Sequence, residues 1–283
     1  LAITGGTGFV GRHVLRLAAE RGHAVRALTR RPQADGDGLL WMEGALDRPT
    51  SLAALVAGAD AVIHIAGVVN APDEAGFEAG NVAGTAAIVE AAENAGVRRF
   101  VHVSSLAARE PALSAYGRSK AVAEALVTRA PLDWTLVRPP AIFGPGDTEM
   151  FEMFRMARRG LVALPPGGRL SVIAVEDLAR LLLDLVPAHE AIGRTYEPDD
   201  GRAGGWTHRD FARAIGTAVG RRILPLALPA AILRGAALGD RLARGAKAKL
   251  TPDRVRYFCH PDWVCDPAKA PPPAFWQPRE ATA

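Results

Sequence analysis

The chain has 283 residues, of which 49% are hydrophobic and 23% charged, and its 34 basic and 30 acidic side chains give a formal net charge of +4. This composition excludes a disordered chain, and no apolar run reaches the roughly 18 residues that a membrane span needs. Because the arginines are interspersed with acidic residues, we predict a solvated arginine-rich surface and no nucleic-acid partner.

The two cysteines, Cys259 and Cys265, are too few for a disulfide framework, so we expect a reducing cytoplasmic location. The first four residues have the pattern of a strand, which predicts that there is no signal or transit segment. Cys259, His260 and Cys265 lack the spacing of a four-ligand zinc site. We therefore predict no metal centre.

The first half of the chain alternates short apolar runs with helical patterns. The predicted strands are Leu1–Thr4, Ala24–Leu28, Leu39–Met42, Ala61–Ile65, Phe100–Val103 and Trp134–Val137. Most are apolar at successive positions, as in strands that are buried on both faces. The predicted helices between them are Phe9–Arg21, Ser51–Ala57, Gly80–Ala95 and Ser114–Arg129. This alternation predicts an α/β fold with a doubly wound parallel sheet and right-handed crossovers.

A glycine-rich loop, Thr-Gly-Gly-Thr-Gly-Phe-Val-Gly at residues 4–11, follows the first predicted strand. Gly5, Gly8 and Gly11 have the spacing G-x-x-G-x-x-G at the junction of a strand and a helix. Glycines permit a tight turn and a close backbone approach, and the helix N-terminus offers free N–H groups to a phosphate. Glycines that serve packing alone are the alternative, but the flanking strand and helix favour a dinucleotide-binding loop.

The second predicted strand has no acidic residue at its end before Asp35. An acidic side chain there would bind the adenosine ribose and favour NAD, whereas Arg30 and Arg31 can meet a 2′-phosphate, with Arg12 assisting. We therefore predict NADP as the cofactor. NAD is the alternative if these arginines are ordinary surface residues.

Tyr116 and Lys120 are four residues apart and share one face of a predicted helix. Lys120 is the only lysine in the first 246 residues of a chain that otherwise uses arginine. A compact ammonium lowers the pKa of a neighbouring tyrosine, and a diffuse guanidinium replaces it poorly. Ser104 and Ser105, just upstream, can orient a substrate oxygen. These residues predict a proton-transfer set, in preference to an exposed helix that carries Tyr and Lys for solubility.

The second half contains many prolines and glycines and predicts one or two strands and several helices, at Leu170–Val175, Val175–Leu185, Thr207–Val219, Ala230–Ala246 and Pro252–Tyr257. We expect a dinucleotide-binding domain over residues 1–165, to which the chain returns at about 170–198, and a smaller, mostly helical, substrate-covering region over 199–283. The apolar stretch Leu224–Leu238 fits a covering core helix better than a partner-binding or membrane-surface helix. For Trp206, Trp263 and Trp276, core packing is favoured over a substrate pocket.

Together these motifs resemble the short-chain dehydrogenase/reductase superfamily, and more closely its extended or atypical branch, the NAD-dependent epimerase/dehydratase family. The resemblance covers most of the chain and implies a Rossmann-type fold. It implies that Ser105, preferred to Ser104 by register, Tyr116 and Lys120 are catalytic. Asn81, in Asn81-Val82-Ala83-Gly84-Thr85, is similar to the family's asparagine that supports the lysine and a proton-relay water.

The resemblance also implies cofactor contacts along several segments. Residues 64–67 resemble the stretch beside the cofactor, residues 98–105 the strand with the catalytic serine, and residues 138–147 the stretch that meets the nicotinamide amide. Residues 175–179 match the motif at which the chain returns to the first half. The implied contacts are Gly5, Thr7, Gly8, Phe9, Val10, Gly11, Arg30, Arg31, Ala45, Leu46, Ile65, Ala66, Gly67, Val103, Ser104, Tyr116, Lys120, Pro139, Ala141 and Ile142.

Three departures from the family's pattern bear on the function. Family members usually have an aspartate that contacts adenine at the position where this chain has Ala45, so adenine recognition here would rest on Leu46 or Asp47. Leu106 follows the serines without an Asp-Glu pair, which argues against the dehydratase branch. The short gap between Ser105 and Tyr116 trims a loop that normally shapes the substrate site.

These features predict an NAD(P)-dependent oxidoreductase or epimerase that transfers hydride between nicotinamide and a carbonyl or hydroxyl carbon. Its substrate would be a nucleotide sugar or another small carbonyl compound. The alternative is a non-catalytic dinucleotide-binding redox sensor or accessory subunit of a larger complex, which would not need the Ser/Tyr/Lys set. The resemblance also allows a homodimer, because dimerisation through two helices is common in the superfamily.

Overall fold

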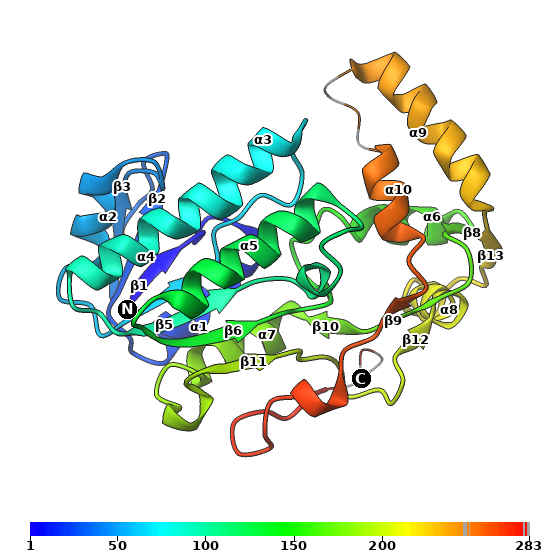
Figure 1. Ribbon diagram of the computed structural model, residues 1–283. Helices are drawn as coiled ribbons and strands as arrows, with labels where there is room; N and C mark the ends of the chain where they lie inside the picture. The colour runs from blue at the N-terminus through cyan, green and yellow to red at the C-terminus, as the bar shows by residue number, and fades with distance from the viewer. Residues whose placement is uncertain (246–247, 249, 280, 282–283) are drawn as a thin grey trace.

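The computed structural model describes all residues except 246–247, 249, 280 and 282–283. The chain folds around a seven-stranded sheet in the order β11-β6-β5-β4-β1-β2-β3, in which every neighbouring pair is parallel (Figure 1). The strands are β1 (Ala2–Thr4), β2 (Val25–Thr29), β3 (Leu39–Glu43), β4 (Ala61–His64), β5 (Arg99–Val103), β6 (Asp133–Val137) and β11 (Arg194–Tyr196). The strand order reverses at β1, and ligands of such sheets bind beyond the carboxyl ends of the strands at this reversal.

Helices cover both faces of the sheet. On one face lie α2 (Pro49–Val56), α4 (Gly84–Asn94) and α5 (Ala115–Arg129), with α3 (Glu74–Phe77) and the π-helical turn η1 (Glu78–Ala83) before α4. On the other face α1 (Phe9–Glu20) packs against α7 (Val175–Asp184). Successive residues of β1 belong to different cores, Ala2 to the cluster under α2 and α4 and Ile3 to the cluster under α1 and α7. This explains why the strands are apolar at successive positions.

The second half adds short strands and helices beside the central sheet. Its elements are β7 (Ala141–Phe143), α6 (Phe151–Arg158), β8 (Leu161–Leu164), β9 (Arg169–Leu170), β10 (Val172–Ala174), β12 (Trp206–Thr207), α8 (His208–Ala218), β13 (Leu224–Ala227), α9 (Ala230–Arg244), α10 (Pro252–Phe258) and β14 (Asp262–Trp263). Short 3-10 turns lie at η2 (Leu106–Arg109), η3 (His189–Ala191) and η5 (Pro267–Lys269). α6 and β8 share an apolar cluster with α8. Among the described residues, no helix combines the length and apolar character needed to cross a bilayer.

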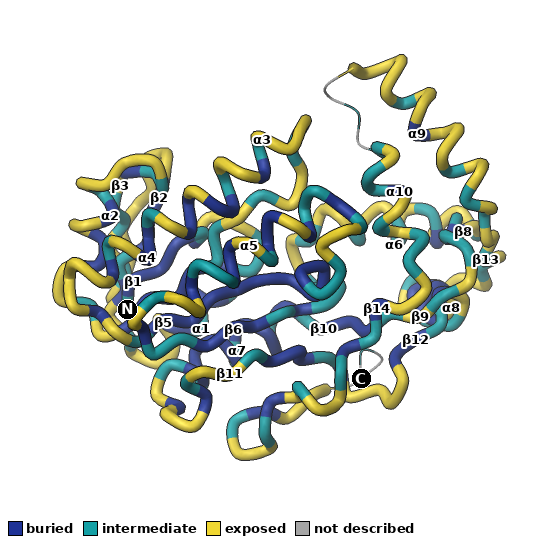
Figure 2. The backbone as a smooth tube through the Cα atoms, in the orientation of Figure 1, coloured by how far each residue is buried: buried dark blue, intermediate teal, exposed yellow. Residues whose placement is uncertain are grey.

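The predicted doubly wound parallel sheet is confirmed, and each of its six predicted strands lies within one residue of its expected ends. The sequence analysis did not find the seventh strand, β11, which has three residues. Trp206, Trp263 and Trp276 are buried, as predicted. The core helix expected at Leu224–Leu238 is wrong, because this stretch divides into β13 and α9, and α9 buries only Ala237. Leu228 and Pro229 connect the two elements, and most of α9 is exposed (Figure 2).

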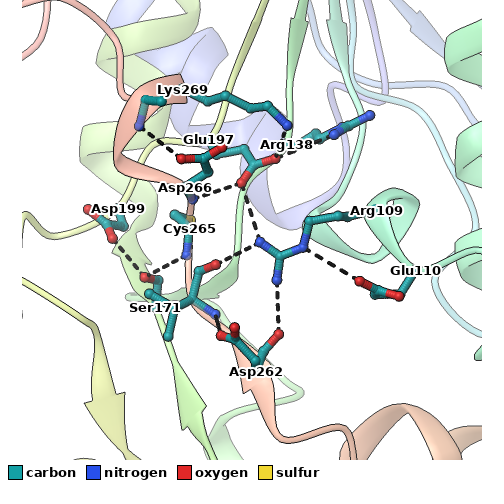
Figure 3. A network of polar contacts seen from close by, with 12 residues as sticks. Arg109, Glu110, Arg138, Ser171, Glu197, Asp199, Asp262, Cys265, Asp266 and Lys269 are labelled. Atoms are coloured by element: carbon teal, nitrogen blue, oxygen red, sulfur yellow. Dashed lines mark hydrogen bonds and ion pairs between the residues drawn. The ribbon is translucent and has the colours of Figure 1, made fainter.

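A buried carboxylate, Glu197, joins the C-terminal chain to the sheet just after β11 (Figure 3). Its fully buried side chain lies 3.4 Å from Arg138 Nη1, 3.6 Å from Arg109 Nη1 and 3.4 Å from Lys269 Nζ. It also accepts a hydrogen bond from the backbone N–H of Asp266 at 3.0 Å. One negative charge is therefore shared among three cations from three different segments.

Arg138 and Arg109 also form hydrogen bonds with other elements, which extends the network beyond Glu197. Arg138 donates two hydrogen bonds, of 2.8 and 2.6 Å, to the Glu124 carboxylate on α5. Arg109, at the end of η2, donates to the backbone carbonyls of Val264 and Asp262 at 2.8 and 2.9 Å. The segment that contains β14 is thus fixed against η2 and the end of β6.

Replacing Glu197 tests how much this network contributes to the stability of the fold. We expect Glu197→Gln to lower the free energy of unfolding by about 3 kcal/mol, because it removes a fully buried charge that pairs with three partly buried cations. Urea denaturation at neutral pH measures the loss. The control is Glu20→Gln, which removes an exposed pair with Arg16 and should cost less than about 1 kcal/mol. Equal losses in the two variants would contradict a structural role for the buried carboxylate.

Candidate active site

The glycine loop packs against the segment that follows β4. Gly5 has a φ of +76°, and a Cβ there would lie 2.6 Å from the backbone nitrogen of Ala66. A Cβ on Gly11 would lie 2.1 Å from the Gly5 carbonyl oxygen. Side chains at either position would force the loop apart, so the tight turn requires glycine.

The loop opens directly into α1, whose first turn suits a phosphate. Gly8 is the N-cap residue and provides no side-chain cap, and the first turn of the helix has no acidic residue. The N–H groups and the positive end of the helix dipole therefore face the loop without a competing carboxylate. The residues present fit the pyrophosphate of a dinucleotide, with Thr7, Phe9 and Val10 beside the three glycines.

The segments expected along the adenosine half lie at the carboxyl ends of neighbouring strands. Arg30 and Arg31 follow β2 and are exposed, and neither forms an ion pair with another described residue. Ala45 and Leu46 follow β3 and are half-buried, and the Leu46 side chain packs closely against Gly84 at the start of α4. Asp35 accepts a hydrogen bond from the Trp41 backbone at 2.7 Å, which holds it near the start of β3.

Residues expected at the nicotinamide lie near the ends of β4, β5 and β6. Ile65, Ala66 and Gly67 follow β4, and the Ala66 N–H donates to Thr4 Oγ1 at 3.2 Å. Pro139, after β6, accepts a hydrogen bond from the Leu106 backbone at 3.0 Å, which joins this stretch to the serine-bearing segment. Ala141 and Ile142 lie on β7, which pairs with β10.

Tyr116 lies in the first turn of α5, beside Ser105. Burial raises the pKa of the Tyr116 hydroxyl, and a hydrogen bond with the Ser105 side chain opposes this rise. Ser105 also caps η2 by accepting from the Ala107 N–H at 3.2 Å, which fixes its hydroxyl. The Ser104 hydroxyl is buried and has no hydrogen-bond partner among the described residues. The geometry therefore favours Ser105 over Ser104 as the serine that acts with Tyr116.

Lys120 lies one helical turn after Tyr116, and its ammonium is buried. Its Nζ donates to the Val103 carbonyl at 2.9 Å. Burial lowers the pKa of Lys120 to about 8, and the Glu124 carboxylate limits the fall. The tuning of Tyr116 by Lys120 stays a prediction.

Asn81 lies in the π-helical turn η1, and its side chain forms three hydrogen bonds. Its Oδ1 accepts from the Val68 N–H at 2.6 Å, and its Nδ2 donates to the Val68 carbonyl and to Ser119 Oγ, both at 2.9 Å. A Cβ on Gly67 would lie 3.0 Å from Asn81 Oδ1 and 3.7 Å from Lys120 Nζ. The structure thus brings Asn81, Gly67 and Lys120 together, whereas the proton-relay role of Asn81 stays a prediction.

The sequence analysis missed the residues that cover Tyr116. An apolar cluster joins Tyr116 to α10 and β14, and its members are Leu106, Ala107, Leu113, Leu170, Tyr257, Trp263 and Cys265. The rings of Tyr257 and Trp263 are 4.6 Å apart, and Trp263 Nε1 donates to the Tyr257 carbonyl at 2.9 Å. Burial first, and then the nearby Tyr116, raises the pKa of Tyr257. No spacing signal could have linked Tyr257 to Tyr116, because the contact depends on how the C-terminal chain folds back.

Two histidines lie inside the sheet near Lys120. His64 on β4 and His102 on β5 are paired across the strands, and their stacked rings are 5.3 Å apart. His64 is hydrogen-bonded to Thr4 at 2.6 Å and to Thr85 at 3.1 Å, whereas the His102 ring nitrogens have no partner among the described residues. Burial, reinforced by the Lys120 charge, lowers the pKa of His64 to about 3 and that of His102 well below its ordinary value. Both rings are therefore neutral in the folded protein.

A family model described as NAD(P)H-binding matches residues 5–187. The chain belongs to this family, within the extended short-chain dehydrogenase/reductases. Among its relatives, a ceramide reductase of Caulobacter vibrioides is 37% identical over 96% of this chain and 87% of its own. A 3-beta-hydroxysteroid dehydrogenase of Mycolicibacterium neoaurum is 28% identical over 84% of this chain and 75% of its own.

Solved structures agree with this assignment. The crystal structure of gox2253 superposes with a TM-score of 0.79, at 25% identity, over 99% of this chain and 93% of that one. Human SDR39U1, solved with NADPH, superposes with a TM-score of 0.73, at 22% identity, over 93% of this chain and 90% of that one. The protein is an NAD(P)-dependent enzyme of the oxidoreductase and epimerase class, as predicted. The alternative of a non-catalytic module is not supported.

The two buried histidines make stability depend on pH. Their folded-state pKa values are depressed, so the unfolded chain takes up their protons from about pH 6.5 downwards and the folded protein does not. We expect the free energy of unfolding to be constant above this value and to fall below it by up to about 1.4 kcal/mol per pH unit for each histidine. Urea denaturation between neutral pH and mildly acidic pH measures the slope.

The variant His102→Phe measures how much His102 contributes to the pH dependence of the free energy of unfolding. Phenylalanine keeps the stack against His64 and cannot titrate, so the slope should be clearly shallower than in the wild type. The matched control is His23→Phe, which makes the same substitution at a half-buried position before β2. An unchanged slope in His102→Phe would show that this ring does not control the acid sensitivity.

Proposed function

We propose that the protein is an NADPH-dependent reductase of a lipid-like ketone. The observation that carries this proposal is the apolar cluster around Tyr116, in which the partly exposed Tyr257 packs with the buried Leu106, Ala107 and Trp263. We call this cluster the apolar wall, and a hydrocarbon chain fits beside it. A nucleotide sugar would place hydroxyl and diphosphate groups against it without partners, which is costly.

The relatives support the same substrate class. The ceramide reductase matches nearly the whole chain, and its name describes the reduction of a lipid. The hydroxysteroid dehydrogenase acts, by its name, on another largely hydrocarbon molecule. Ceramide carries one secondary hydroxyl, so the ketone from which a reductase forms it is the one oxidised at that carbon. We propose this keto lipid, or a close analogue, as the substrate.

The proposed reaction uses Tyr116 as the acid. NADPH, when bound, supplies a hydride for the carbonyl carbon. Tyr116 donates its hydroxyl proton to the carbonyl oxygen, which completes the alcohol, while Ser105 hydrogen-bonds to the same oxygen. Burial raises the pKa of Tyr116, which keeps the phenol protonated and ready to donate. Lys120 would bind the nicotinamide ribose and, with the cofactor, stabilise the phenolate that is left. Asn81 would hold Lys120 and a relay water that returns the proton.

Removing the Tyr116 hydroxyl tests the chemistry. We expect Tyr116→Phe to reduce turnover of the keto ceramide by about 10²- to 10⁴-fold, because the general acid is lost, while the Kd for NADPH changes little. NADPH oxidation at 340 nm measures turnover, and tryptophan quenching measures binding. Tyr196→Phe is the matched control, since Tyr196 lies on β11 against Phe275, and it should retain turnover.

The same assay tests the proposed substrate class when a lipid ketone is compared with a nucleotide sugar. We expect the keto ceramide, presented in detergent micelles, to be reduced, and UDP-glucose to be neither oxidised nor epimerised. Conversion of UDP-glucose in place of the keto lipid would overturn the proposed class. Full turnover in Tyr116→Phe would overturn the proposed acid.

We also propose that NADPH is preferred to NADH. Arg30 and Arg31 follow β2, where they are exposed and form no ion pair with a described carboxylate. Charge-assisted hydrogen bonds from guanidinium groups suit a 2′-phosphate, which NADH lacks. In the NAD-dependent arrangement an acidic residue would take their place.

Charge reversal at these arginines separates the two cofactors. We expect Arg30→Glu/Arg31→Glu to weaken NADPH binding at least about tenfold, through the lost phosphate contacts, and to leave NADH binding nearly unchanged. Titration of each cofactor by tryptophan quenching gives both Kd values. Arg16→Glu, on the exposed face of α1, is the control. A wild-type protein that binds NADH more tightly than NADPH would contradict the assignment.

A further inference from the structure

Most of α9 is exposed (Figure 2), and its outward face is apolar, the reverse of an ordinary surface helix. Ile232, Leu238 and Leu242 are 55%, 58% and 89% exposed. At about 100° per residue these side chains share a face with Gly235 and Gly239 and with exposed alanines, and this face carries no charge. We call it the outer face of α9.

The opposite side of α9 is fixed to the protein. Ala237 is buried, Asp240 accepts a hydrogen bond from the Leu250 backbone at 2.9 Å, and α9 contacts α10. The helix therefore cannot rotate to hide its leucines without breaking these contacts. β13, directly before it, exposes two more leucines, Leu224 and Leu226, which lie on the same side of the strand.

The charges around the outer face are positive. Arg234 and Arg241 are exposed along one edge of it, and Arg221 and Arg222 are exposed just before β13. The only acidic residue of α9 is Asp240, which is half-buried and lies 3.2 Å from Arg244. An apolar face edged by arginines is the pattern of a helix that lies in the interface of an anionic membrane.

We propose that α9 and β13 dock the protein on an anionic phospholipid bilayer. Ile232, Leu238 and Leu242 enter the acyl region, and Arg234 and Arg241 meet lipid phosphates. A second copy of the chain fits this face less well, because it would bring two sets of arginines together without acidic partners. The docking itself is independent of the proposed reaction.

The position of α9 connects the proposed membrane-docking surface to the candidate active site. α9 packs against α10, and α10 carries Tyr257 to the apolar wall beside Tyr116. The bilayer-facing helix and the wall of the candidate active site are thus neighbouring elements (Figure 1). If the substrate is a lipid ketone, as the proposed function has it, this substrate would reach Tyr116 from the membrane along α10.

Vesicle sedimentation tests the docking and requires neither cofactor nor substrate, so its failure is separate from failure of the proposed reaction. The vesicles are phosphatidylcholine alone or mixed with phosphatidylglycerol. We expect the full chain to bind the anionic vesicles and to bind neutral ones more weakly. Leu238→Glu/Leu242→Glu should lower partitioning at least about tenfold, and Arg234→Glu/Arg241→Glu should lower binding to anionic vesicles about fivefold for each arginine.

The matched control is Leu40→Glu, which places a charge at a leucine that is 48% exposed on β3, far from α9 (Figure 1). It should bind vesicles like the wild type, and circular dichroism and thermal melting verify that each variant is folded. Wild-type protein that stays unbound with anionic vesicles would overturn the proposal, as would an equal loss in Leu40→Glu. A wild-type dimer that Leu238→Glu/Leu242→Glu converts to monomers, with no vesicle binding, would assign the outer face to a second copy instead.

Discussion

The contact of the C-terminal chain with Glu197 positions the wall of the candidate active site. Glu197 follows the last strand of the sheet and is fully buried, where an unpaired carboxylate would be strongly unfavourable. Its cations come from η2, the end of β6 and η5, so its burial requires that these segments converge. Arg109 then holds the backbone on either side of Trp263, and Trp263 holds Tyr257 over Tyr116. The apolar cluster beside Tyr116 thus depends on a charge network that lies outside the cluster.

Burial also determines which charges the interior can carry. His64 and His102 stay neutral, Tyr116 stays protonated, and the buried ammonium of Lys120 has a pKa lowered to about 8. A guanidinium could not take this place, because it would keep its full charge and its width in a site that offers one carbonyl. This accounts for a single lysine in a long arginine-rich stretch.

The sequence predicted the first half of the fold because its strands are buried on both faces and so stay apolar at successive residues. The glycine loop and the Tyr116–Lys120 pair were likewise visible, since each depends on local spacing. β11 was not, because three residues give no periodicity. Tyr257 was missed because its contact with Tyr116 arises from the fold-back of the C-terminal chain. The stretch at residues 224–238 was misassigned because apolar content alone does not show whether a helix turns its leucines inward or outward.

We propose that hydride passes from NADPH to the carbonyl carbon of a lipid ketone beside Tyr116. Mass spectrometry of the alcohol formed from keto ceramide, with NADPH deuterated at either face of the nicotinamide C4, tests this transfer. We expect one deuterium on the carbinol carbon with one of the two labelled cofactors and none with the other. An alcohol without deuterium from both cofactors, or no alcohol at all, would contradict it.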